Sequence, residues 1–523
     1  MKATTMSKMA VLACQASVAA WLLLPSQLAA QTSAGPGCDA SRPAVAHASD
    51  GAKTSMRGAP IPCLTNTGLR TLEDALVVTN KGVVMLAPVP PGDGKPTGIA
   101  RSKNQGATWE LINPGGNPPR RGAGDMTLAH DKVTDRVFLS SEIGAPARVD
   151  YSDDGGDSWQ QSSQIFVQND HTLIFFGPPT EALKPKMNYP VVVYYVVAGG
   201  YGTCPRGGFC GTHIAKSLDG GRTFGTGSVM VPFPDECPFP ANFPVGQYGL
   251  EGTVTADGTI YLPITPCQKP YVAVSKDAGD SWELRKAVDR EIVGWGEFPI
   301  AADAQGNLHG AYTDRADGLL YLIHSVDGGK SWSVPLVASA PKVNETSMPR
   351  LAVGNRGKVV MSYFGSTNGP RPFAPPCIDG GLSNYTAQFP LGQTNSPTSC
   401  SDRLQQTWNM YVTETANPLE PQPRFWSATL NRPSQPVLYG ANPAGMRYPG
   451  PDGSPRFSIG TSGGFHTDYF GMEIGPDGTA WVGFMQQCPP GVSDGNPNCK
   501  KRPGQTAADP QIGMVGRLLH MAR

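Results

Sequence analysis

Acidic side chains recur just before a repeated strand pattern in this sequence. When the repeated units are aligned on their turns, one equivalent position is occupied by Glu73, Glu251, Glu297 and Tyr469. Within about a residue of that position stand Asp74, Asp125, Asp170, His171 and Asp468. Carboxylates that crowd together raise one another's pKa, which suits one of them to donate a proton at neutral pH. The residue types therefore predict acid–base catalysis, or the binding of a cation or of sugar hydroxyls.

The same carboxylates also have a purely structural interpretation. A carboxylate can accept hydrogen bonds from backbone N–H groups of a neighbouring strand around a water-filled channel. The sequence leaves both interpretations open, and each requires a fold that brings the starts of several strands together.

A motif that occurs five times marks the elements that would position these residues. It reads Ser-x-Asp/Asn-x-Gly-x-Ser/Thr-Trp/Phe and occupies residues 102–109, 152–159, 217–224, 275–282 and 325–332. The Asp or Asn side chain accepts backbone N–H groups in a tight turn, and the glycines supply positive φ. The hydroxyls satisfy further turn groups, and the aromatic side chain anchors the outgoing strand. Each copy is predicted to be a β-hairpin, and five hairpins indicate a repeat protein.

The motif resembles the Asp-box, or bacterial neuraminidase repeat, of the sialidase-like β-propeller family. In that family the boxes are structural and lie away from the catalytic face. The resemblance therefore implies an all-β propeller whose function is carried by residues outside the boxes.

The spacing of the motifs sets the size of one blade. Successive boxes start 50, 65, 58 and 50 residues apart, about the length of one four-stranded blade. Two further units without a box follow, so we predict seven four-stranded blades. The last unit shows only three strands, and an N-terminal strand would complete it and remove an exposed edge. The family itself has six blades, so six blades with an appended hairpin is the alternative.

The beginning of the sequence is typical of a secretory signal. Lys2 and Lys8 precede an apolar stretch at residues 9–24, and small residues suggest cleavage near Ala30. We predict a signal peptide at 1–30, an N-terminal segment with the closing strand at 31–66, and the propeller at 67–523. The mature protein is expected to be secreted or periplasmic, and no second stretch is long enough to span a membrane.

Charge and cysteine content limit the partners. The chain has 42 basic and 42 acidic side chains, so no basic field is available for nucleic acid. We expect a monomer whose partner is an extracellular glycan or glycoconjugate. Ten cysteines outside the signal predict disulfides, with sequence-local pairs as a guess: Cys38–Cys63, Cys204–Cys210, Cys237–Cys267, Cys377–Cys400 and Cys488–Cys499. No zinc-type spacing occurs, so no cofactor or resident metal is predicted, although the channel could hold a cation.

The family resemblance assigns roles to individual residues. Sialidases bind the sugar carboxylate with three arginines and use a tyrosine nucleophile, a glutamate partner and an aspartate acid. Here the closest match to the family's Arg-Ile-Pro motif is Arg57-Gly58-Ala59-Pro60, which departs from it. The remaining roles would fall to Arg121 and Arg350 in the clamp, Tyr469 as nucleophile, Asp74 or Asp125 as acid, and Glu251 or Glu297 as partner of the tyrosine.

Further side chains near the same mouth could bind substrate. These are Glu73, Asp468, His171, His466 and Trp295, the last as a sugar-stacking platform or as a residue buried between blades. The sequence thus predicts a carbohydrate-active propeller, most plausibly a glycoside hydrolase. The alternatives are a non-catalytic propeller that binds a glycan or protein and, less favoured, a polysaccharide lyase that uses Tyr with His.

Overall fold

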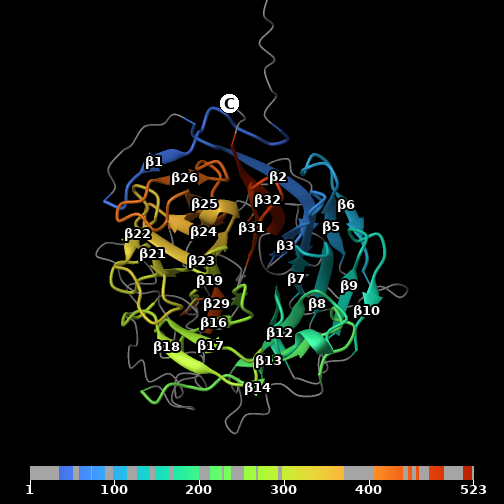
Figure 1. Cartoon of the computed structure of the whole chain (residues 1–523). Helices are drawn as coiled ribbons and strands as arrows, with labels where there is room; N and C mark the ends of the chain where they lie inside the picture. The colour runs from blue at the N-terminus through green and yellow to red at the C-terminus, as the bar shows by residue number, and fades with distance from the viewer. Residues whose placement is uncertain are drawn as a thin grey trace, which may run out of the picture. The chain divides into compact units, whose positions relative to one another are not determined.

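Seven antiparallel sheets follow one another along the chain and form a seven-bladed β-propeller, as predicted. The computed structural model describes residues 35–50, 58–71, 74–88, 98–114, 126–141, 148–163, 169–199, 212–225, 229–236, 252–266, 269–292, 297–369, 406–439, 446–449, 455–458, 470–487 and 511–520. Gly35 to Arg523 belong to one compact unit. In Figure 1 the colours run from blue to red along the chain, so the blades can be followed in sequence order.

The first three blades each contain four strands. Blade 1 contains β3 (Asp74–Val78), β4 (Val84–Pro88), β5 (Ile99–Ser102) and β6 (Glu110–Ile112). Blade 2 contains β7 (Met126–Asp131), β8 (Arg136–Ser141), β9 (Arg148–Ser152) and β10 (Gln160–Gln161). Blade 3 contains β11 (Asn169–Gly177), β12 (Val192–Gly199), β13 (Thr212–Ser217) and β14 (Val229–Met230).

The next two blades repeat this plan. Blade 4 contains β15 (Thr253–Val254), β16 (Ile260–Ile264), β17 (Tyr271–Ser275) and β18 (Glu283–Lys286). Blade 5 contains β19 (Ile300–Ala302), β20 (Leu308–Thr313), β21 (Leu320–Ser325) and β22 (Leu336–Val337). The middle strands β4, β8, β16 and β20 are buried along their whole length because neighbouring blades cover both faces.

Strands from the N-terminal side join the last two blades. Blade 6 contains β23 (Glu345–Val353), β24 (Val359–Ser366), β25 (Thr407–Thr415) and β26 (Phe425–Thr429), extended by β1 (Val45–His47), with β27 (Leu438–Tyr439) on β25. Blade 7 contains β30 (Gly471–Ile474), β31 (Ala480–Gln487), β32 (Gln511–Leu519) and, outermost, β2 (Ile61–Arg70). Outside the blades lie the hairpin β28 (Met446–Pro449) and β29 (Pro455–Ser458) and the 3-10 turns η1 (Lys184–Lys186) and η3 (Asn355–Gly357).

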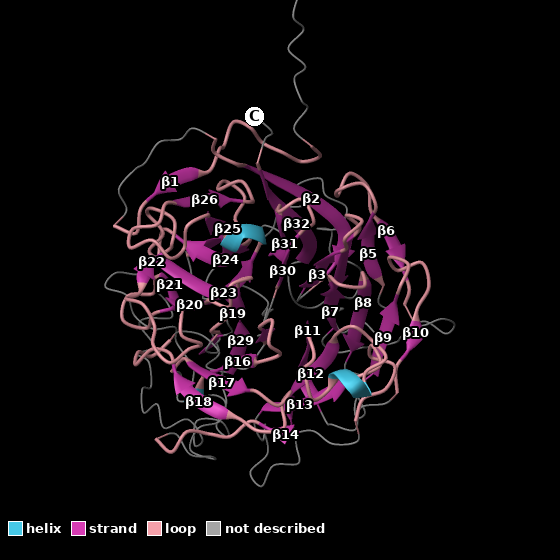
Figure 2. Ribbon diagram, in the orientation of Figure 1, coloured by secondary structure: helices cyan, strands magenta, loops and turns pink. Residues whose placement is uncertain are grey.

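The innermost strands close a ring. Each of β3, β7, β11, β15, β19, β23 and β30 contacts the next, and β30 contacts β3. Seven apolar clusters in the described residues lie between consecutive blades, one at each interface around the ring. Strands and loops make up nearly all of the drawn chain (Figure 2). In the part described, no helix has the length and apolar character needed to cross a bilayer.

The five repeated turns share one hydrogen-bond pattern and join the third strand of a blade to its outer strand. In the turn 152–159, Ser152 Oγ donates to Asp154 Oδ1 at 2.8 Å and accepts the N–H of Gly156 at 2.8 Å. Asp154 Oδ1 also accepts the N–H of Ser158 at 2.8 Å. Equivalent bonds form in the other four turns. The polar residues of the motif therefore satisfy the turn from within.

A cationic side chain of the preceding blade also binds each repeated turn, always at the third residue after the first serine. We call this contact a latch. The five latches are Arg517 to the Gln105 side-chain oxygen, Arg101 to the carbonyl of Gly155, Arg136 to that of Gly220, Lys216 to that of Ala278 and Arg285 to that of Gly328. All five acceptor residues have positive φ, between 58° and 74°. The repeat thus connects blades as well as strands.

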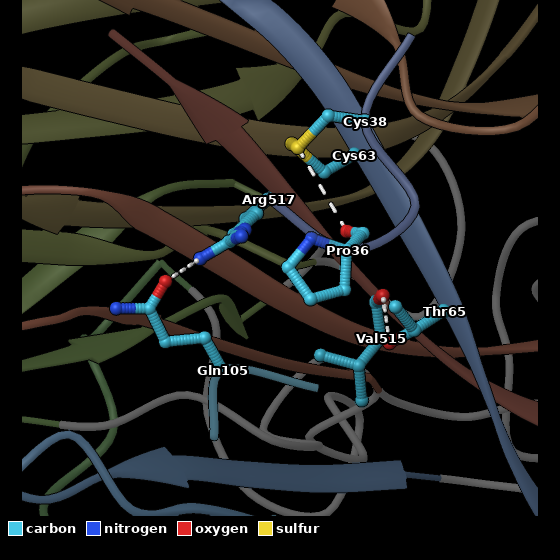
Figure 3. Close-up of a disulfide and its surroundings, with 7 residues drawn as sticks. All are labelled: Pro36, Cys38, Cys63, Thr65, Gln105, Val515 and Arg517. Carbon is cyan, nitrogen blue, oxygen red and sulfur yellow. Dashed lines mark hydrogen bonds between the residues drawn. A yellow bond between two sulfur atoms is a disulfide. The ribbon is translucent and has the colours of Figure 1, made fainter. Parts of the chain in front are cut away.

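A disulfide fixes the N-terminal segment to the closing strand. Cys38 is bonded to Cys63 of β2, the pairing expected from sequence locality, and Figure 3 shows it beside Arg517 and Gln105. Backbone bonds from Asp39 to Pro62 and from Leu64 to Gly37 support the same contact. The other expected cysteine pairs lie outside the described residues.

Reduction of this disulfide is expected to lower the free energy of unfolding by about 3 kcal/mol, because the bond closes a loop of 25 residues in the unfolded chain. The measurement is chemical unfolding of the Cys38→Ser/Cys63→Ser double variant against wild type without reductant. Equal stability of the two proteins would show that the backbone bonds alone hold the segment.

Candidate active site

A cavity of about 370 Å³ lies in the channel of the ring and is lined by all seven innermost strands. These strands run in the same direction relative to the ring, so their first residues meet at one mouth and their last residues at the other. Asp74, Arg350 and Phe470 line the first mouth, and His130, Lys132 and Glu473 line the second.

Asp74 is a buried carboxyl group at the start of β3. Its residue is 1% exposed, and a parallel bridge places it beside Phe470 at the start of blade 7. Burial raises the pKa of Asp74 to about 8, and the nearby Thr71 hydroxyl offsets a smaller part of that shift. Neither carboxylate oxygen has a partner with full hydrogen-bonding geometry in the described part of the chain. A pKa of about 8 favours the protonated form of Asp74 at neutral pH, which is the form that can donate a proton.

Arg350 places a guanidinium group at the same mouth. A bulge in β23 between Ser347 and Arg350, where Met348 has φ of 54°, redirects the strand just before this side chain. Arg350 Nε donates to the carbonyl oxygen of Phe470 at 3.0 Å, and its guanidinium carbon lies 5.5 Å from the Phe470 ring centre. Phe470 thus connects Asp74 of blade 1 to Arg350 of blade 6.

The structure does not place the other predicted site residues in the cavity lining. Glu297 is 1% exposed and lies two residues before the cavity-lining Pro299, but its own side chain is not part of the lining. His171 lies on β11, and its side chain is not described. The remaining candidates fall outside the described residues: Glu73, Arg121, Asp125, Glu251, Trp295, His466, Asp468 and Tyr469.

Sequence reasoning missed the second mouth, where His130 lies between two carboxylates. Its Nδ1 lies 3.2 Å from Glu473 Oε1, and its Nε2 lies 3.1 Å from Asp135 Oδ1. Burial opposes the charged ring, but bonds and charges from Glu473 and Asp135 outweigh it and raise the pKa of His130. The sequence does contain a signal for this mouth. Aligning the units on the turn that follows each innermost strand also aligns the last residues of those strands, where His130 and Glu473 lie.

Glu473 also accepts a hydrogen bond from a neighbouring inner strand, which is the structural role considered above for the predicted carboxylates. Its Oε2 accepts the backbone N–H of Val78 on the neighbouring inner strand at 2.8 Å. Capping of inner-strand N–H groups by a carboxylate therefore occurs in this channel, at the mouth opposite Asp74. Among the described residues no group of three His, Cys, Asp or Glu is arranged to hold a metal ion.

No protein-family model matches the sequence, and no curated protein matches it. Solved structures that match this chain include a protein of unknown function from Dyadobacter fermentans, at 13% identity over 92% of this chain and 100% of that chain, with a TM-score of 0.38. A xyloglucanase from Xanthomonas campestris is 18% identical over 61% of this chain and 51% of that chain, with a TM-score of 0.38. The intramolecular trans-sialidase of Ruminococcus gnavus is 14% identical over 79% and 89%, with a TM-score of 0.32.

Proposed function

We propose that this chain is an exported carbohydrate-active propeller that hydrolyses a glycosidic bond, with Asp74 as the general acid. The observation that carries the proposal is that Asp74, a residue of the cavity lining, holds a buried carboxyl group whose pKa is raised to about 8. Hydrolysis of a glycoside requires a proton for the leaving oxygen, and an acid that stays protonated at neutral pH can supply it.

The other residues at the mouth are assigned supporting roles. The Arg350 guanidinium, held by the Phe470 carbonyl, provides positive charge in the cavity lining for an anionic or hydroxyl-rich substrate. Tyr469 directly precedes Phe470 in sequence and is the candidate nucleophile, with Glu251 or Glu297 as its partner and Asp125 as the alternative acid. The Cys38–Cys63 disulfide supports an oxidising compartment, consistent with export.

The test is an Asp74→Asn variant assayed on a panel of chromogenic glycosides, with Asp289→Asn as an exposed control of the same chemistry. We expect kcat to fall about 10²–10⁴-fold in Asp74→Asn and to stay unchanged in the control. Wild-type kcat/KM should also fall as pH rises through about 8, where Asp74 loses its proton. Full activity of Asp74→Asn would exclude Asp74 as the acid.

A wild-type protein that hydrolyses none of the glycosides would contradict the hydrolase proposal. Glycan-array binding without turnover would then favour the non-catalytic glycan-binding propeller, and product with a new double bond would favour a lyase.

A further inference from the structure

The second mouth of the channel contains a network that joins three blades. Glu473 belongs to β30 of blade 7, and its two oxygens reach His130 of blade 2 and the N–H of Val78 of blade 1. Asp135, in the turn after β7, accepts the backbone N–H of Asn80 in the blade 1 turn at 2.7 Å and faces the other nitrogen of His130. This network crosses the seam at which the last blade meets the first.

The geometry defines the protonation state of His130. Ionised carboxylates only accept hydrogen bonds, and a neutral imidazole has a single N–H donor. Both ring nitrogens face a carboxylate oxygen, so both contacts are hydrogen bonds only when the ring is protonated. The His130 side chain is 1% exposed, which isolates the pairs from water.

We propose that His130, Glu473 and Asp135 form a pH-sensitive clasp, which holds the seam between blades 7, 1 and 2 when His130 is protonated and weakens when the proton is lost. The proposal is independent of the catalytic assignment, since it concerns the opposite mouth and the closure of the ring.

Two lysines also lie near the carboxylates of the clasp. Lys132 Nζ lies 3.6 Å from Glu473 Oε1 and donates to the carbonyl of Ile474 at 3.3 Å, and Lys81 Nζ lies 3.8 Å from Asp135 Oδ2. These lysines share the two carboxylates with His130 and so reduce the stabilisation of the protonated ring, but the pKa of His130 is still raised. Asp131, the neighbour of His130 in sequence, is engaged by the hydroxyls of Thr134 and Tyr189 and faces away from the clasp.

The sign of the pH dependence follows from the raised pKa of His130. A histidine whose pKa is higher in the folded than in the unfolded state contributes its full stabilisation below the unfolded value near 6.5. That contribution disappears as pH rises through the folded pKa. The clasp should therefore hold fully below about pH 6.5 and loosen as the pH rises through the folded pKa of His130.

The first test is an NMR titration of the histidine rings of the wild-type protein, assigned with His130→Gln. The expected result is a His130 pKa above that of a free histidine, and a pKa below it overturns the proposal. This measurement needs only the folded wild-type protein.

The second test compares thermal unfolding of wild type, His130→Gln and the control His47→Gln from pH 6 to pH 9. His47 is buried on blade 6, bonded to Ser427, and burial lowers its pKa, so its pH dependence has the opposite sign. We expect the Tm deficit of His130→Gln to be largest at pH 6 and to shrink towards pH 9. Hydrogen exchange of 471–474, compared between wild type and His130→Gln at each pH, should show the same convergence. A Tm deficit of His130→Gln that is constant with pH would show that His130 stabilises the fold by packing alone and would overturn the proposal.

Discussion

An Asp74→Asn variant is expected to be more stable than the wild type at pH 8, by about 2–4 kcal/mol, although it loses the proposed catalytic acid. Burial raises the pKa of Asp74 to about 8, so the folded chain holds a proton that the unfolded chain releases above about pH 4. Each pH unit between these values therefore costs the wild-type fold about 1.4 kcal/mol, or roughly 5 kcal/mol by pH 8. The buried asparagine amide has a desolvation cost of its own, of about 1–3 kcal/mol, which reduces the net gain.

The measurement is urea unfolding of both proteins at pH 4, 6 and 8. The stability of Asp74→Asn relative to wild type should rise with pH, from a deficit of about 1–3 kcal/mol near pH 4, where the pKa shift contributes little, to the expected gain at pH 8. Asp289→Asn, at an exposed position, should follow the wild type throughout. Parallel stability curves for wild type and Asp74→Asn would mean that Asp74 titrates normally and would also remove the basis of the proposed acid.

An Arg136→Ala variant is expected to lose about 4 kcal/mol of stability. Arg136 is 4% exposed, and its guanidinium carbon lies 4.2 Å from the Tyr151 ring centre and 5.0 Å from that of Tyr189. It also donates to the carbonyl of Gly220 in the turn of blade 3 and to both carboxylate oxygens of Asp153. The variant loses two cation–π contacts, of about 1 kcal/mol each, and leaves a buried carbonyl unsatisfied, for about 1–3 kcal/mol. The Asp153 pair adds little, because that side chain is half exposed.

Two further variants distinguish the contribution of the Arg136 contacts from the contribution of its positive charge. Arg136→Lys retains the charge but not the planar fork and should recover only part of the loss. Lys184→Ala removes an exposed ion pair with Glu181 and should change stability by less than about 1 kcal/mol. A loss in Arg136→Ala no larger than that of Lys184→Ala would show that the latches do not contribute to the stability of the ring.

The fold was predictable because its signal is local. Within a repeated turn, hydrogen-bonded residues are at most four positions apart, as Ser152 with Asp154 or Gly156 and Asp154 with Ser158 show. The motif therefore appears intact in the sequence, and its spacing predicts the confirmed count of seven blades. Asp74 and Arg350 could be nominated for the same reason, because each stands at or near the start of a recognisable strand. Their chemical roles remain predictions.

The contacts between blades could not be predicted in this way. His130 and Glu473 are 343 residues apart, and no short pattern connects them. The latches join residues 43 to 84 apart where the acceptor is a backbone carbonyl, a group that every residue carries. Burial, which decides the pKa of Asp74, depends on all neighbouring blades together. Sequence patterns thus identify the hairpins, while the properties of the site arise from assembly of the ring.

The pairing of β2 with β32 has a consequence for how the protein comes into existence. Thr65 and Val515 meet across 450 residues of chain, so the ring of a growing polypeptide stays an arc with an incomplete seventh blade until β32 has been synthesised. The cavity lies on the axis of that arc and needs all seven inner strands. We therefore expect nascent or C-terminally shortened chains to show no ligand binding. Folding should end in one late, slow step, in which the central cavity forms all at once.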